Sequence, residues 1–141
     1  MAKINPSDIT VAKGSLYPAM FRGYTPVQFT DSLNAFVLEA GRKTRAAASD
    51  YDTATGDRLE VLREAEKAYS YHLAFQRLAE LHANLASTAS EVNISASYTN
   101  NARENRILAA QYLVNWGVLL IVPIVLTRAR ASSSIPLVAE F

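Results

Sequence analysis

Histidine is rare and cysteine is absent in this chain, although both side chains commonly bind metal ions. The only two histidines, His72 and His82, lie ten residues apart, whereas a helix binds a metal ion through a pair four residues apart. The chain contains no cysteine, which excludes disulfides, thiolate metal sites and thiol nucleophiles. We therefore predict no metal site and no cofactor, and we expect both histidines to be partly buried for structural reasons.

Carboxylates four residues apart could act as a general acid and base on one helix face. Glu60 and Glu64 have this spacing, but Arg63 and Lys67 are interleaved with them. Such a pattern favours ion pairs on a solvated helix surface. We predict ion pairs here and no catalytic pair.

Other motifs that would support catalysis or ligand binding are incomplete or absent. Segment 50–57 is similar to a calcium-binding loop, but Val61 stands where the last ligand, a glutamate, belongs. The sequence has no GxxxxGK[ST], GxGxxG or GxSxG, so it offers neither a phosphate-binding loop nor a nucleophile elbow. We predict no catalytic residue and no enzyme activity.

The elements that would carry these side chains are predicted to be helices. Apolar residues at helical spacing predict one helix from Thr25 to about Ala48, a long one over about 58–86 and a third from Thr99 or Asn101 to about Leu120. Thr25 begins a capping box with proline at the first helical position. The predicted fold class is mostly α, a bundle of about three helices, one of them long.

Three segments lack a helical pattern. Residues 1–24 mix proline and glycine with aromatic side chains and predict an irregular arm that packs on the rest of the chain. The helical pattern fails at about 88–100, where residues 92–98 alternate apolar and polar side chains and predict an extended loop or a strand that must pair elsewhere. Residues 123–141 begin with a proline, which should end the third helix, and they predict an extended docking tail. The predicted organisation is an arm (1–24), a helical domain (25–122) and this tail (123–141).

The longest apolar stretch, 107–127, holds twenty-one residues without a charge. That length would cross a bilayer, but Gln111, Asn115 and Pro123 divide it. A buried helix followed by an extended segment is therefore favoured over a membrane span. Two other helices would hardly cover so apolar a segment, so we expect neighbouring copies to help bury it. The predicted oligomer interface consists of the large side chains near its centre: Tyr112, Trp116, Leu119 and Leu120.

Two groups of residues after the third helix are candidates for contacts. An apolar end after a run of serines is unusual for a free tail, and we predict that it docks on a partner. The predicted docking residues are Ile135, Pro136, Leu137, Val138 and Phe141. Arg128 and Arg130 follow the uncharged stretch, as Arg103 and Arg106 precede it. They would line a channel, bind lipid headgroups or mark the solvated ends of a buried element.

The net charge limits the kinds of partner that the protein is expected to bind. Fourteen basic and thirteen acidic side chains give a net charge of +1, which argues against a protein that grips nucleic acid. The alternatives left open are a structural assembly protein, a small single-pass membrane protein with its span at 107–127, and a cytosolic helical interaction module.

In layout, the chain resembles the head-to-tail connector (adaptor) proteins of tailed bacteriophages. The resemblance lies in an alanine- and tyrosine-rich stretch of the long helix, 62–75, the alternating segment 92–98 and the apolar helix segment 105–113. It implies a subunit of a homo-oligomeric ring, twelve-fold in that family, in the neck of a virion assembled in the host cytoplasm. The ring would bind the portal protein and a stopper or tail protein, and DNA would pass through it without specific binding.

Overall fold

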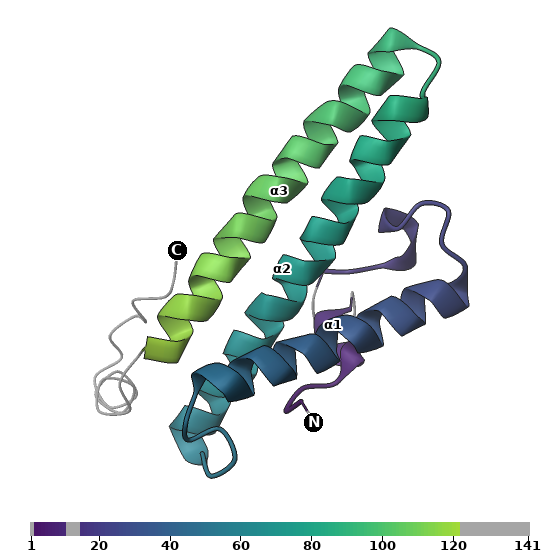
Figure 1. Cartoon of the computed structure of the whole chain (residues 1–141). Helices are drawn as coiled ribbons and strands as arrows, with labels where there is room; N and C mark the ends of the chain where they lie inside the picture. The colour runs from purple at the N-terminus through teal and green to yellow at the C-terminus, as the bar shows by residue number, and fades with distance from the viewer. Residues whose placement is uncertain (1, 11–14, 122–141) are drawn as a thin grey trace.

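The computed structural model describes residues 2–10 and 15–121 (Figure 1). It consists of two short 3-10 helices, η1 (Pro6–Ile9) and η2 (Pro18–Met20), followed by three α-helices, α1 (Pro26–Ala47), α2 (Gly56–Thr88) and α3 (Val92–Ile121). The helices α2 and α3 form a long antiparallel hairpin, and α1 packs on the other side of α2. The predicted mostly helical bundle is confirmed.

The start of α1 is as predicted. The Gln28 backbone N–H donates to Thr25 Oγ1 at 3.1 Å, and the Thr25 N–H donates to Gln28 Oε1 at 2.8 Å. This reciprocal capping box satisfies two of the amide groups that a helix start leaves free. Along the helix, Phe29, Leu33 and Phe36 are buried on one side. The helix therefore turns one apolar face towards α2.

A charged turn connects α1 to α2. Arg58 donates two hydrogen bonds to the Asp50 carboxylate, at 2.8 and 3.0 Å, and the Arg58 side chain is nearly buried. The hydrogen bond from Arg58 lowers the pKa of Asp50. Gly56 begins α2 with φ +58°, a left-handed conformation that glycine adopts without steric cost. In the segment that is similar to a calcium loop, the Asp50 carboxylate is therefore paired with an arginine.

The extended loop or strand predicted for residues 88–100 is wrong. Only Ala89–Glu91 separate α2 from α3, which begins at Val92, before the predicted caps Thr99 and Asn101. Apolar–polar alternation indicates a strand when one face is buried, but Val92 and Ile94 are both exposed. The Ser95 N–H instead donates to Glu91 O, a helical hydrogen bond, and its hydroxyl donates to Ala86 O at the end of α2.

The N-terminal arm belongs to the hydrophobic core. Ile4, Ile9, Leu16 and Phe21 are buried, and they pack in one cluster with residues of all three α-helices. The arm also passes close to α1: a Cβ on Gly41 would lie 2.8 Å from the Cα of Ala2, so only glycine permits this approach. The prediction that the arm packs on the rest of the chain is confirmed for the residues that the structure describes.

Candidate interaction surface

The helix α3 is unusual in how little of it is buried. It has 30 residues, yet only Ala102, Ala109 and Leu119 are buried within the described chain. Two of these are alanines, which allow the backbones of α2 and α3 to approach closely. Seven of the ten exposed large hydrophobic side chains in the described part lie on α3, so this helix is the surface that most needs a partner.

Exposed side chains follow one face of α3, which we call the α3 strip: Arg103, Ile107, Ala110, Val114 and Ile121. Their spacing of three, four or seven residues places them on the side opposite Ala109 and Leu119. Ile107, Val114 and Ile121 are 53%, 60% and 77% exposed. A shallow hollow of about 480 Å³ lies at its centre, lined by Ile107, Ala110, Gln111, Val114 and Asn115. The hollow and its rim would accept a side chain from another helix.

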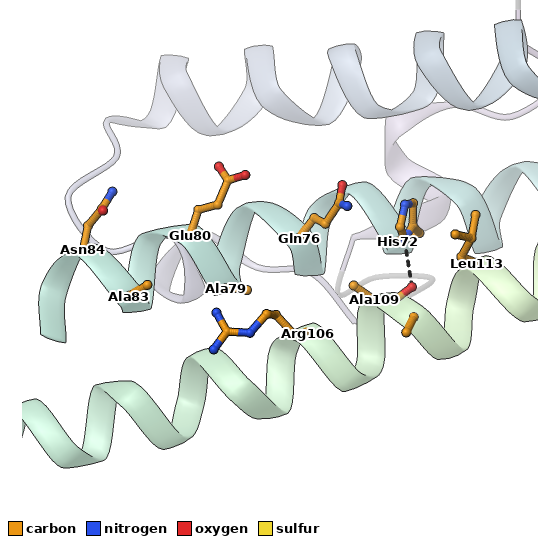
Figure 2. A pocket seen from close by; sticks show the side chains of 10 residues that line it. His72, Gln76, Ala79, Glu80, Ala83, Asn84, Arg106, Ala109 and Leu113 are labelled. Carbon is orange, nitrogen blue, oxygen red and sulfur yellow. Dashed lines mark hydrogen bonds between the residues drawn. The ribbon is translucent and has the colours of Figure 1, made fainter. Parts of the chain in front are cut away.

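A second hollow, of about 740 Å³, lies between α2 and α3 (Figure 2). Its inner wall includes Ala79, Ala83 and Ala109, and Arg106 extends along α2 beside the first two. Ala110 lines both hollows. The α3 strip and this groove therefore form one continuous surface.

The four predicted interface residues lie on the other side of α3, against their own chain. Tyr112 stacks on Phe75 with ring centroids 5.6 Å apart. Trp116 donates from Nε1 to Thr44 Oγ1 at 3.1 Å. Leu119 is buried in a cluster with Val61, Ala65 and Ala68, and Trp116 and Leu120 pack against this cluster. Their part in contacts between copies stays a prediction. Ile107, Val114 and Ile121 were not among the predicted interface residues. Their signal is a periodic apolar stripe, which can be assigned to the outer face only once the face towards α2 is known.

The remaining predicted residues of the tail, Ile135, Pro136, Leu137, Val138 and Phe141, lie outside the described residues, as do Arg128 and Arg130.

The predicted surface ion pairs on α2 are confirmed. Arg63 lies 2.9 Å from Glu60, and Lys67 lies 3.1 Å from Glu64. Each of the two basic side chains therefore pairs with one of the two carboxylates. The carboxylates are solvated and paired.

One acidic side chain of α2 is fully buried. The Glu66 carboxylate accepts a hydrogen bond from the Lys3 backbone N–H at 2.7 Å and another from the Tyr51 hydroxyl. Burial and, second to it, the hydrogen bond to Glu66 raise the pKa of Tyr51. This cluster joins the N-terminal arm, the α1–α2 turn and α2. Its carboxylate has partners on both oxygens, and we assign it a structural role.

Both histidines contact α3. His82 is partly buried, as predicted, whereas His72 is buried. His72 Nδ1 lies 2.8 Å from Ala109 O, as Figure 2 shows. His82 Nδ1 lies 2.9 Å from the side-chain nitrogen of Asn105, and its ring stacks on Tyr98. Because an amide N–H donates, His82 Nδ1 acts as the acceptor and carries no proton.

Acid should weaken the outer end of the hairpin through His82. Burial lowers the pKa of His82 below its ordinary value, so the unfolded chain binds this proton more readily than the folded one. The stabilising contribution is complete above the unfolded pKa of about 6.5 and is lost as the pH falls below it. We expect the free energy of unfolding from urea titrations to be lower at about pH 5.5 than at about pH 7.5. His82→Gln should reduce this difference, and an unchanged difference would contradict the assignment.

The comparisons with known proteins yield no relative. No protein-family model, no curated protein and no solved structure matches the chain. Within residues 2–10 and 15–121 there is no group of acidic, histidine or cysteine side chains that could hold a metal ion. None of the described helices is long and apolar enough to cross a membrane.

Proposed function

We propose that this protein is a non-enzymatic structural assembly subunit, a head-to-tail connector that forms a ring in the neck of a tailed bacteriophage. The observation that carries the proposal is the exposed α3 strip. Only three of the 30 residues of α3 are buried within the part of the chain that the structure describes, and a neighbouring molecule that covers the outer face would stabilise the helix further.

The shape of the subunit supports this proposal. The hairpin of α2 and α3 is long and narrow, and α1 packs along only part of α2 (Figure 1). Elongated subunits of this kind have large side surfaces relative to their cores, which suits lateral contacts in a ring. The near-neutral charge suits a channel through which DNA must pass without adhering.

In the proposed assembly, the portal protein binds one end of the ring, and a stopper or tail protein binds the other. The twelve-fold symmetry rests on the family resemblance alone. The docking tail and the residues proposed to line the channel, Arg128 and Arg130, belong to the same proposal.

The proposal is tested with the genes that flank this one. We expect a portal or capsid gene among the neighbours, and we expect the purified chain to bind that portal as a closed ring, visible by electron microscopy and by native mass spectrometry. A chain that keeps the mass of one subunit at every concentration and does not bind the portal would overturn the proposal.

Removal of the docking tail is expected to leave folding unchanged and to prevent assembly. Deleting residues 132–141 should leave the helical circular dichroism and the thermal midpoint of the bundle unchanged, because the described core lies within residues 2–121. Binding to the portal should be lost, as measured by co-sedimentation. A truncated chain that assembles normally would contradict a docking role for the tail.

A further inference from the structure

The outer face of α1 is a second surface without a partner in the described chain. Asp31, Ala35 and Leu38 are exposed on it at positions i, i+4 and i+7, and Leu38 is 61% exposed. These residues lie opposite Leu33 and Phe36, which face the core. The face thus carries an acidic side chain, a small one and a large apolar one in order along the helix.

The matching series on α3 has the opposite charge. Arg106, Ala110 and Val114 are exposed at positions i, i+4 and i+8. Neither Asp31 nor Arg106 forms an ion pair with any residue that the structure describes. If the two helices lie side by side and parallel, Asp31 faces Arg106 and Ala35 faces Ala110. Leu38 then lies at the hollow beside Val114.

The direction of this pairing follows from charge. In the parallel register, Asp31 faces Arg106. In the antiparallel register, the basic end of α1, with Arg42 and Arg45, would approach Arg103 and Arg106 instead, and like charges across an interface are unfavourable. The small residues Ala35 and Ala110 at the middle of the parallel register allow the two helices to approach closely.

The two faces lie on different sides of the molecule. The helix α1 crosses one part of α2 on the side away from α3 (Figure 1). The outer face of α1 and the α3 strip are both turned away from the buried side of their own helix. The two faces of one copy therefore cannot bind each other, and each must bind a face of another copy. Contacts between two different surfaces of identical subunits are head-to-tail, and they close into a ring when the rotation between subunits permits.

We propose that the α3 strip binds the outer face of α1 from a second copy of this chain, with Leu38 of that copy in the hollow lined by Ile107, Ala110 and Val114. This inference rests on the proposed ring and names the contact that builds it. The Asp31–Arg106 pair fixes the register.

Cysteine cross-linking tests the contact directly, because the chain has no cysteine of its own. A chain with Leu38→Cys, mixed with a chain with Val114→Cys, should form a disulfide-linked dimer under mild oxidation. Neither variant should link to itself. Val92→Cys, at the outer end of the hairpin and 84% exposed, is the matched control and should not link to Leu38→Cys. Self-linking of Val114→Cys would indicate a symmetric α3–α3 contact and would overturn the inference.

Charge exchange tests the register. Asp31→Arg and Arg106→Asp should each weaken association of the copies by about tenfold, because each replaces an attraction with a repulsion. The two changes in one chain should restore association. Glu104→Arg reverses the charge of an exposed side chain on another face of α3, and it should leave association of the copies unchanged.

The outcomes separate this inference from the proposed function. A ring that forms on the portal but shows neither the Leu38–Val114 link nor charge rescue would overturn this contact and leave the connector proposal standing. A chain that never associates would overturn both.

Discussion

Replacement of Glu66 with alanine is expected to lower the free energy of unfolding by about 3 kcal/mol. The Glu66 side chain is fully buried, and its carboxylate accepts hydrogen bonds from the Lys3 N–H and the Tyr51 hydroxyl. Alanine would leave both donors in a dry interior without this acceptor and would open a cavity beside them. The arm would lose its hydrogen bond from the Lys3 N–H to α2.

Urea titration followed by circular dichroism measures this change. Glu64→Ala is the matched control, because Glu64 lies on the same helix but is 54% exposed and paired with Lys67; its loss should cost at most about 1 kcal/mol. Glu66→Gln keeps an acceptor for one donor and should fall between the two. Equal stabilities for the variants at 66 and 64 would show that the buried carboxylate does not anchor the arm.

The helical elements were predictable where local chemistry and burial agree. The capping box at Thr25 and the buried stripe of Phe29, Leu33 and Phe36 both indicate the same helix, and α1 begins within a residue of the predicted start. The turn before α2 was predictable for the same reason, because its glycine, threonines and aspartates favour their own local hydrogen bonds.

The segment 92–98 was not predictable from its pattern. Its alternation would indicate a strand if a sheet were available to bury one face, but the described chain has none. Helical hydrogen bonds and contacts with α2, such as the stacking of Tyr98 on His82, set its conformation. Tertiary packing overrides a weak local preference in such cases.

The candidate surface was located only in part. The uncharged stretch 107–127 pointed to α3, but its apolar residues surround the helix on several sides. Which of them face α2 depends on Ala102 and Ala109, whose small side chains let α2 approach. The interface was predicted from large side chains such as Trp116, and these lie on the face of α3 that the rest of the chain covers.

Trp116 and Val114 are two residues apart and should respond to substitution in opposite ways. Trp116→Ala is expected to lower the free energy of unfolding by about 3 kcal/mol, because the indole packs on Tyr69 with centroids 5.0 Å apart and binds Thr44. It is one of the few contacts between α1 and α3, so its loss would also loosen α1.

Val114→Asp should instead leave the fold intact and abolish association of the copies. Val114 is 60% exposed, and substitutions at exposed positions usually change stability by less than about 1 kcal/mol. An aspartate in the hollow of the α3 strip would place a charge where the proposed contact excludes water. Urea titrations at dilutions where the chain is monomeric measure folding, and sedimentation velocity at high concentration measures association. If Trp116→Ala abolished association without loss of stability while Val114→Asp left association unchanged, the interface would lie on the Trp116 side of α3 and the α3 strip would be a solvent-exposed face.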